Sequence, residues 1–483
     1  MSPLATKDAP KTVEEVEKLL SNDTKVKVAG VDVDGVLRGK VMSKEKFLGA
    51  IKYGFGFSSA LFGWDMHDIN YTRELLIANE ANGFRDLTAI IDLSTYRRLS
   101  WEENVPFFLI RFLDSDTREP ISVDPRSVLE LVCEKARSKG WKCVAGAELE
   151  YYQFLETPQT IAQKHFSNLN PLTPGNHGYS LLRPTYNHKY FYELYDEARA
   201  FGIEVEGHHT ETGPGVYETA LAYTEASRMA DNTVLYKLLA KSIGMKYGIM
   251  PTFMAKPYSD MAGCSGHIHV SLQGVSGKNL FSVSDDELKD GGRKTASHEQ
   301  LRFISQQAEW FLAGIISGLS DVTVMMCPTI NSYKRLLGGS AMWAPDTATY
   351  GYESRKASIR IVSPPSCPPA ATRFEIRVPG ADMNTHYALS AIFALGLRGI
   401  ELRLPIPYGP LGTDGVTRET VQHLPTDLQS ATSAFAKPES LARELFGDLF
   451  VDHVAGSREH ELGTFKKAVT NWEGEFTPFI RWY

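Results

Sequence analysis

Two glutamates stand one residue apart in an otherwise apolar stretch of this chain. Glu148 and Glu150 belong to residues 143–155, which read Cys-Val-Ala-Gly-Ala-Glu-Leu-Glu-Tyr-Tyr-Gln-Phe-Leu. Because side chains alternate along a β-strand, both carboxylates would point to the same face. Burying two like charges side by side is costly, and a divalent cation is the simplest compensation. The pair therefore predicts a core strand at a metal site. The alternative, common for such a pair taken alone, is a half-exposed ion-pair surface.

Composition and charge narrow the class of protein. The 483 residues are 43% hydrophobic and 23% charged, which is ordinary for globular domains, and the length predicts two or three of them. The net charge of −7 and the lack of a long basic run argue against nucleic-acid binding. Five cysteines without a C-x-x-C pair predict a reduced, cytoplasmic setting. We expect no membrane span, because no run of about 18 apolar residues and no signal core stand out.

The first part of the chain predicts a small domain built around a mixed sheet. Residues 1–11 form a polar, disordered tail, and residues 12–21 form a short helix. Strand patterns recur at residues 25–35, 38–42, 88–93 and 107–112. Residues 54–68 are rich in Gly, Ser and aromatics and predict a functional loop. This N-terminal domain spans residues 12–123.

The second domain, residues 124–483, begins where Asp124 can cap a helix whose first residue is Pro125. It interleaves strands and long helices. Strands are expected at residues 143–155, 204–211, 266–272, 358–362 and 373–378, and helices at about 224–246, 298–319 and 384–401. The sequence contains neither a G-x-G-x-x-G motif nor a P-loop motif. A nucleotide site of either common type is therefore unsupported.

Three further clusters repeat the geometry of the glutamate pair. Glu211 ends one strand and Glu218 begins the next segment, across a Gly-Pro-Gly turn. His267 and His269 share one strand face, as do Arg373, Glu375 and Arg377. Each cluster has an ordinary structural explanation: a turn, a core histidine or a salt-bridge ladder. Their joint occurrence indicates oxygen-rich Mg²⁺ or Mn²⁺ sites rather than zinc, because no cysteine joins a cluster.

Arginines supply the complementary charge. Arg335 precedes a Gly-rich loop at residues 336–340, and Arg355 and Arg360 follow shortly after. The planar guanidinium group binds carboxylates and phosphates through two parallel hydrogen bonds. Carboxylate-held metals with converging arginines indicate phosphoryl transfer to an acidic substrate.

These motifs together resemble the glutamine synthetase family, type I branch, and they follow the family's order over most of the chain. The matching phrases are Ala147-Glu-Leu-Glu150, His208-His-Thr-Glu211, Gly213-Pro-Gly215, Gly266-His-Ile-His-Val-Ser271, Asn331-Ser-Tyr-Lys-Arg335, Arg355-Lys-Ala-Ser-Ile-Arg360 and Arg373-Phe-Glu-Ile-Arg377. The resemblance implies an α+β fold with an N-terminal β-grasp domain. The C-terminal catalytic domain would be of the glutamine synthetase/guanido kinase type, with a curved antiparallel sheet. It also implies a homo-oligomer of two stacked rings, a decamer or dodecamer, with active sites between neighbouring subunits.

The resemblance also implies roles for individual residues. ATP and two to three Mg²⁺ (or Mn²⁺) ions would serve each active site. One metal would be held by Glu150, Glu211 and Glu218, and another by Glu148, His267 and Glu375. Arg335 would bind the glutamate carboxylate beside Gly263. Arg355, Arg360 and Arg377 would stabilise the transferring phosphoryl group, and His269, Ser271, Arg373 and Arg355 would contact the nucleotide. The γ-carboxylate would attack ATP to give an acyl phosphate, which an amine then converts to an amide.

The departures from the family pattern concern the amine. In the phrase Gly56-Phe-Ser-Ser59, Gly56 replaces the aspartate that binds ammonium in the family, and Trp343 precedes Ala344-Pro345 where a glutamate is expected. Asp65 and Asp68 are two candidates for a replacement acid. An ammonium ion needs negative charge, which Gly56 and Trp343 do not supply, whereas a larger amine needs apolar or aromatic contacts. Trp343 and Phe57 would suit a carbon-bearing amine.

The leading hypothesis is therefore an ATP-dependent ligase that joins the γ-carboxyl of glutamate to an amine other than ammonia. All its substrates would be small molecules. One alternative is an ordinary glutamine synthetase. A second is a non-catalytic relative kept for assembly, which loss of metal ligands would favour; this chain keeps all six.

Overall fold

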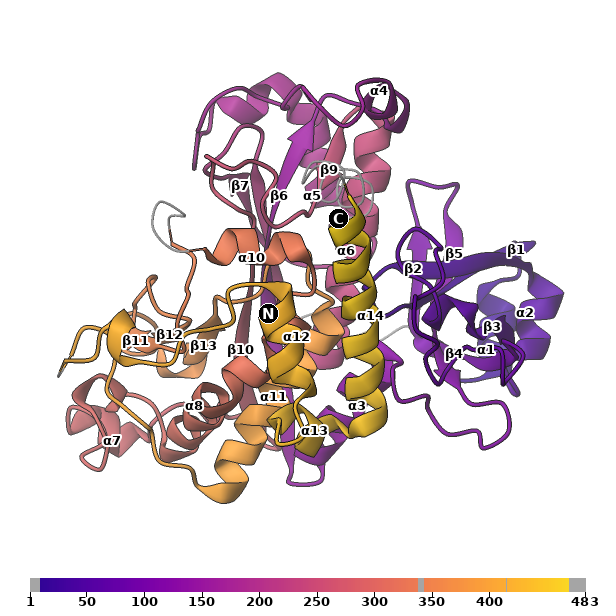
Figure 1. The fold of residues 1–483 in the computed structure, drawn as a ribbon. Helices are drawn as coiled ribbons and strands as arrows, with labels where there is room; N and C mark the ends of the chain where they lie inside the picture. The colour runs from indigo at the N-terminus through magenta and orange to yellow at the C-terminus, as the bar shows by residue number, and fades with distance from the viewer. Residues whose placement is uncertain (1–8, 338–342, 414, 469–483) are drawn as a thin grey trace.

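The computed structural model describes residues 9–337, 343–413 and 415–468, so most of the predicted tail over residues 1–11 lies outside the described residues. Two sheets organise the chain. In Figure 1 the smaller sheet stands apart on the right, and the larger sheet runs through the centre of the main body. The mixed helix and strand content confirms the α+β prediction.

The smaller sheet is mixed, as predicted. Its strand order is β2-β1-β5-β4-β3, with β1 and β5 parallel and the other pairs antiparallel. The strands are β1 Lys25–Val31, β2 Leu37–Ser43, β3 Phe55–Ser58, β4 Asp86–Leu99 and β5 Val105–Leu113, accompanied by α1 Val13–Leu19 and α2 Lys44–Ala50. The helix and all four predicted strands of this domain are confirmed. The sheet order supports the β-grasp assignment, which stays a prediction.

One prediction for this domain was wrong in part. The loop expected at residues 54–68 contains edge strand β3 and the 3-10 helix η1, Ser59–Phe62. Gly56 in β3 pairs with Thr88 in β4, so backbone pairing along β4 gives this Gly- and Ser-rich segment strand geometry that its composition does not favour.

The larger sheet carries the four predicted clusters. Its order is β11-β12-β13-β10-β6-β8-β7, and β9 pairs with β6 off this path. Only the β11–β12 pair at the edge is parallel among these described strands. The strands are β6 Trp141–Phe154, β7 Val205–Thr210, β8 Tyr217–Glu225, β9 Met250–Thr252, β10 Gly266–Gly274, β11 Tyr350–Tyr352, β12 Ile359–Val362 and β13 Arg373–Ile376. The five predicted strands are confirmed, and long β6 lies near the middle of the order.

Helices cover this sheet and build the core. Helix α11, Thr385–Leu402, packs against α8, α3 and α6 and is buried along most of its length. The helices of the main body are α3 Pro125–Arg137, α4 Pro158–Gln163, α5 His188–Ala200, α6 Ala226–Lys246, α7 Asp285–Lys289, α8 Gln306–Gly318, α9 Thr323–Met326, α10 Ile330–Leu336, α12 Leu428–Ala436, α13 Leu441–Phe446 and α14 Asp448–Lys467. Helices expected near 224–246 and 384–401 are confirmed. The one expected at 298–319 begins later, because Ser305 accepts a hydrogen bond from the Ala308 amide and caps α8 there.

One helical stretch of the described chain, Gln306–Met326, is long and apolar enough to cross a bilayer. In this fold 83% of its most apolar window is buried inside the protein. A buried core helix meets the same criteria of length and hydropathy.

Buried polar contacts tie the two sheets together. Arg126, in the first turn of α3, donates to Asp231 of α6 at 2.9 Å and to Asp92 of β4 at 2.8 Å. His386 at the start of α11 lies 3.0 Å from the same Asp231 carboxylate. Asp124 caps α3 through the Ser127 amide, as predicted, and Pro125 is its first residue. The domain boundary at residue 124 stays a prediction.

Candidate active site

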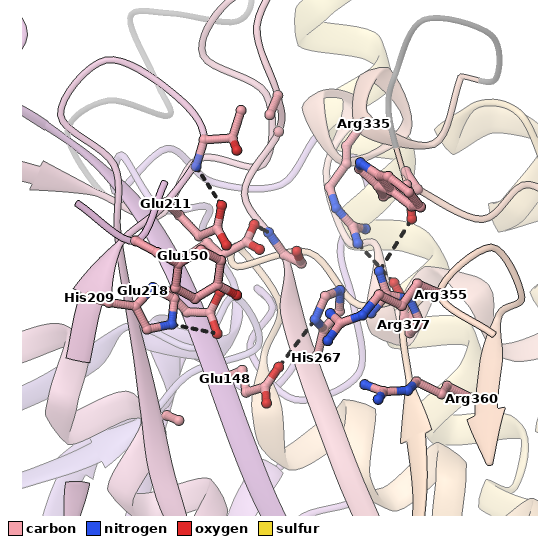
Figure 2. Close-up of a pocket in the computed structure, with 18 residues that line it drawn as sticks. Glu148, Glu150, His209, Glu211, Glu218, His267, Arg335, Arg355, Arg360 and Arg377 are labelled. Carbon is pink, nitrogen blue, oxygen red and sulfur yellow. Dashed lines mark hydrogen bonds and ion pairs between the residues drawn. The ribbon is translucent and has the colours of Figure 1, made fainter. Parts of the chain in front are cut away.

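A cavity of about 650 Å³ opens over the larger sheet. Figure 2 shows carboxylates and His209 along one side of it, four arginines along the other, and His267 between them. Eleven of the predicted site residues line this cavity: Glu148, Glu150, Glu211, Glu218, Gly263, His267, Arg335, Trp343, Arg355, Arg360 and Arg377. The fold thus brings together groups that are more than 200 residues apart in the sequence.

Strand register assembles the acidic side. Glu218 of β8 stands opposite both Glu150 of β6 and His209 of β7. Glu211 directly follows β7, so the turn after it returns the chain to Glu218 as predicted. Ligand atoms of His209, Glu211 and Glu218 lie within 4.8 Å of one another. His209 Nε2 is 3.6 Å from the Glu218 carboxylate, which raises the pKa of this imidazole to about 9.

A second group of ligand atoms forms beside the first. Glu148 of β6 is paired in register with His267 of β10, and Glu375 of β13 is paired with His269. His267 Nδ1 lies 3.5 Å from Glu148 and 3.6 Å from Glu375, and the three residues place ligand atoms within 4.8 Å of one another. Glu375 is only 1% exposed, so its charge depends on these neighbours.

The two glutamates of β6 respond differently to this surrounding. Burial raises the pKa of both, but hydrogen bonds from His267 and His269 outweigh burial at Glu148 and lower its pKa well below the ordinary range. At Glu150 burial prevails, with repulsion from Glu218 adding to it, and the pKa is raised. The Ser265 amide donates to Glu150 at 2.6 Å, which fixes the carboxylate between the two clusters.

The arginine side is held in place by short contacts. Arg360 donates to Glu375 at 2.9 Å, and Arg377 forms an ion pair with the same carboxylate. Burial raises the pKa of Glu375, but His267 and His269, together with Arg377, outweigh it and lower that pKa to about 2. Arg335 of α10 donates to the main-chain carbonyls of Arg377 and Val378, each at 2.8 Å. The arginines are therefore oriented before any anion arrives.

The pocket beside Arg335 requires a glycine. A Cβ atom on Gly263 would lie 2.6 Å from the Ala255 carbonyl oxygen and 2.9 Å from Arg335 Cγ. Asn331 of α10 holds the same loop through its side-chain amide, which accepts from the Lys256 N–H at 2.7 Å and donates to the Lys256 carbonyl at 3.0 Å. Helix α10 thus shapes this part of the cavity through both its arginine and its asparagine.

A second cavity, of about 430 Å³, shares Glu148 and Ala220 with the first. His269, Ser271 and Arg373 line it, and their predicted contact with the nucleotide stays a prediction. Arg373 Nε donates to His269 Nδ1 at 3.1 Å, and His269 Nε2 lies 3.0 Å from Glu148. This chain of contacts links the second cavity to the metal-ligand clusters. Arg355 was predicted both to stabilise the transferring phosphoryl group and to contact the nucleotide. Of the two cavities, it lines the first and not the second.

Two predicted substrate residues lie at different places. Trp343 lines the mouth of the first cavity and is 61% exposed. Gly56 lies on β3 of the smaller sheet and lines neither cavity, so its predicted role would need a neighbouring subunit.

Sequence reasoning gave no role to His209 or Tyr179. Their rings stack with centroids 4.5 Å apart, and both line the first cavity. The phrase His208-His-Thr-Glu211 held a signal for His209, since it stands two residues before Glu211. Tyr179 lies in an irregular segment whose amide pairs with the Thr210 carbonyl, a contact that no local pattern encodes.

The donor set fits hard divalent cations. Carboxylate oxygens with one imidazole in each cluster suit Mg²⁺ or Mn²⁺, and among the described residues no cysteine lines the cavity. Glu150 would regain a favourable charged state beside a cation, because its carboxylate is otherwise crowded by Glu218.

Comparison with known families agrees with this geometry. The profile described as glutamine synthetase, catalytic domain, matches residues 122–477. The chain belongs to the glutamine synthetase family, whose members are ATP-dependent carbon–nitrogen ligases that use divalent metal ions. The predicted resemblance and enzyme class are confirmed.

Several relatives match nearly the whole chain. A type-1 glutamine synthetase 2 of Dictyostelium discoideum is 39% identical over 94% of this chain and 84% of its own. A glutamate–isopropylamine ligase of a Pseudomonas species is 33% identical over 93% of both chains. A gamma-glutamylethanolamide synthetase of Streptomyces coelicolor is 31% identical over 98% of this chain and 96% of its own. The solved GmaS/ADP complex has the same fold, with a TM-score of 0.77 at 24% identity over 96% of this chain and 98% of that one.

Proposed function

We propose that this protein joins the γ-carboxyl of glutamate to an amine other than ammonia, with hydrolysis of ATP to ADP and phosphate. The observation that carries the proposal is Trp343 at the mouth of a cavity that five of the six predicted metal ligands and four arginines line. An exposed indole offers apolar and aromatic contacts to the carbon part of an amine. The isopropylamine and ethanolamide enzymes among the relatives support the same conclusion.

The first cavity would hold glutamate and the metal ions. Arg335, whose guanidinium is fixed by two carbonyls, would bind a glutamate carboxylate over Gly263. The two clusters, with Glu150 between them, would hold two or three Mg²⁺ (or Mn²⁺) ions. When bound, such ions neutralise and polarise phosphate oxygens.

The second cavity would hold the nucleotide, with its phosphates directed through the shared residue Glu148 toward the arginines. There Arg355, Arg360 and Arg377 would orient the γ-phosphoryl group for attack by the γ-carboxylate of glutamate. The first step forms an acyl phosphate and releases ADP. In the second step the amine attacks the acyl carbon, phosphate leaves, and the amine loses a proton.

We also propose a ring-shaped homo-oligomer, in two stacked layers of five or six subunits. Its support is the position of Gly56, which lies away from both cavities of its own chain. In such a ring, β3 of a neighbouring subunit would lie at the mouth of the first cavity, beside Trp343. Analytical ultracentrifugation tests the assembly: a decamer or dodecamer is expected, and a monomer would contradict it.

Phosphate release with glutamate, ATP and a panel of amines tests the reaction. The wild type should turn over with alkylamines faster than with ammonium. Trp343→Glu should shift the preference toward ammonium by about tenfold, since one charge contact of about 1.4 kcal/mol corresponds to that factor. The matched control Trp343→Phe keeps an aromatic ring and should keep the preference.

The competing function is glutamine synthesis, which the Dictyostelium relative's name favours. Robust turnover with ammonium and none with larger amines would establish it and reject the amine proposal. The non-catalytic alternative predicts that no amine in the panel supports phosphate release. The grouping of the predicted metal ligands in or beside one cavity argues against that alternative.

A further inference from the structure

Helix α14 brings a buried charged cluster to the back of α10, away from the cavity. Glu461 accepts a hydrogen bond from the Ile330 amide at 2.8 Å. Arg458, one turn earlier, donates to the Pro328 carbonyl at 2.7 Å and forms an ion pair with Asp34 of the smaller sheet's domain. Arg458 and Asp34 are 3% and 5% exposed. The last helix therefore connects the N-terminal domain to the start of the helix that carries Arg335.

The Ile330 amide has a particular need for this contact. It is the first N–H group of α10, and the first four N–H groups of a helix have no acceptor within the helix. The Thr329 cap satisfies the Ser332 amide, which leaves Ile330 to Glu461. Burial raises the pKa of Glu461 to about 8, with Arg458 and the Ile330 amide opposing that shift, and the carboxyl group can accept this bond in either protonation state.

A second acid, the buried Asp382, holds the same turn. Asp382 accepts hydrogen bonds from the Thr329 and Ser332 hydroxyls, at 2.9 and 2.5 Å. Two acids from separate elements thus fix the first turn of a helix only seven residues long. Such a short helix has little stability of its own, so its position depends on these contacts.

Helix α10 also reaches the cavity, through Asn331 in its first turn and Arg335 in its last. Asn331 anchors the Lys256 main chain on the loop that leads to Gly263, and Arg335 lines the cavity at that glycine. Because Arg335 is 4% exposed and packed against Gly263, a displacement of α10 would move the guanidinium and the loop together.

We infer that Glu461 is a positioning residue for the glutamate pocket: it fixes α10 and, through it, Arg335 and the loop held by Asn331. Glu461 touches neither cavity, and its side chain is 18% exposed. The inference rests on the proposed function, in which Arg335 binds glutamate. Contacts between α14, α10 and the N-terminal domain would then affect how tightly the enzyme binds glutamate.

Steady-state kinetics of Glu461 variants in the full-length oligomer test this inference. Glu461→Ala should raise the KM for glutamate by about tenfold, the equivalent of one hydrogen bond, while the KM for ATP and kcat stay within about threefold. Glu461→Gln keeps an oxygen that can accept from the Ile330 amide and should restore the KM to within about threefold of the wild type. If Glu461→Ala does not fold, Glu461→Asp, which withdraws the carboxylate by one methylene, serves in its place.

The matched control is Glu459→Ala on the same helix. Glu459 is half-exposed and lies 3.6 Å from Arg73 in a surface ion pair, so its loss should leave the KM for glutamate unchanged. An unchanged KM in Glu461→Ala, or an equal rise in the KM values for glutamate and ATP, would overturn the inference.

Hydrogen exchange separates this inference from the proposed function. Faster exchange in the peptide spanning Ile330–Leu336 of Glu461→Ala, but not of Glu459→Ala, is expected. If that result is found while the wild type shows no glutamate-dependent turnover, the positioning of α10 stands and the proposed function fails. Unchanged exchange in Glu461→Ala would overturn the positioning itself.

Discussion

Glu148 and Glu150 share one face of β6, yet their carboxyl groups have opposite pKa shifts. The pKa of Glu148 is lowered by hydrogen bonds from His267 and His269, whereas burial and Glu218 raise that of Glu150. The first glutamate is therefore stable as an anion without any ion bound. The second, whose pKa is raised, gains more as an anion from an added positive charge.

The first prediction concerns this difference. A carboxyl whose folded pKa is raised above its unfolded value destabilises the fold once the pH exceeds the unfolded pKa, because the folded state must then ionise it or keep the proton. Glu150→Gln should therefore leave the metal-free protein as stable as the wild type or more so. It should also lose most turnover, since it removes a metal ligand.

Thermal unfolding with EDTA and with saturating Mg²⁺ measures this effect. The wild type should gain about 3 kcal/mol from Mg²⁺ at a hundredfold excess over Kd, and Glu150→Gln should gain less. Equal gains in both proteins would show that Glu150 does not hold the ion.

The second prediction concerns Gly263. An alanine methyl group would overlap the Ala255 carbonyl oxygen and the stem of Arg335, at 2.6 and 2.9 Å. Gly263→Ala should cost about 1–3 kcal/mol of stability and raise the KM for glutamate. Gly49→Ala in α2 is the control, because nothing lies within 4 Å of its Cβ position and alanine favours a helix.

The third prediction concerns the junction between the sheets. Arg126 and Asp231 are 5% and 4% exposed, so removal of the cation leaves a buried carboxylate without its main partner. Arg126→Met should lower the free energy of unfolding by about 3–5 kcal/mol in urea. Lys25→Met breaks an exposed pair with Glu103 and should change it little; similar losses in both variants would contradict the argument.

The fourth prediction is a pH dependence. Burial, with Arg458 and Arg73 nearby, lowers the pKa of His453 on α14 to about 3, and neither ring nitrogen has a hydrogen-bond partner among the described residues. Between about pH 3 and the ordinary pKa of 6.5, the unfolded state binds more protons than the folded state. Stability therefore falls as the pH falls through this window.

The wild type should lose about 2 kcal/mol through His453 between about pH 8 and pH 5. His453→Phe keeps the edge-on packing against Tyr71. Between the same two pH values, its free energy of unfolding should fall by about 2 kcal/mol less than that of the wild type. Urea midpoints at the two pH values measure the difference, and parallel losses in both proteins would assign the acid sensitivity to other groups.

The sequence predicted those parts of the site that strand alternation controls. Glu148 with Glu150, and His267 with His269, could be placed on common faces because residues two apart in a strand share a face. Their meeting across β6 and β10 depended on register, which the chain does not state locally. His209 was missed because its partner Glu218 lies across the sheet rather than along the strand.

Elements with weak local patterns were also missed. Edge strand β3 forms from a Gly- and Ser-rich segment because β4 pairs with it, and α10 is a short helix fixed by Glu461 and Asp382 from elsewhere in the chain. The helix that carries Arg335 thus depends on tertiary contacts which residues 330–336 alone cannot reveal.

Glu375 pairs with both Arg360 and Arg377, so these three residues cannot be altered independently. For protein engineering, they differ in this from the exposed residues at the rim of the cavity. The β12–β13 face forms one interlocked unit, so an altered residue there would disturb its neighbours as well. Tyr179 and Trp343 stand outside that unit on exposed positions at the rim. Libraries aimed at new acceptor molecules should diversify the rim and leave the interlocked strands untouched.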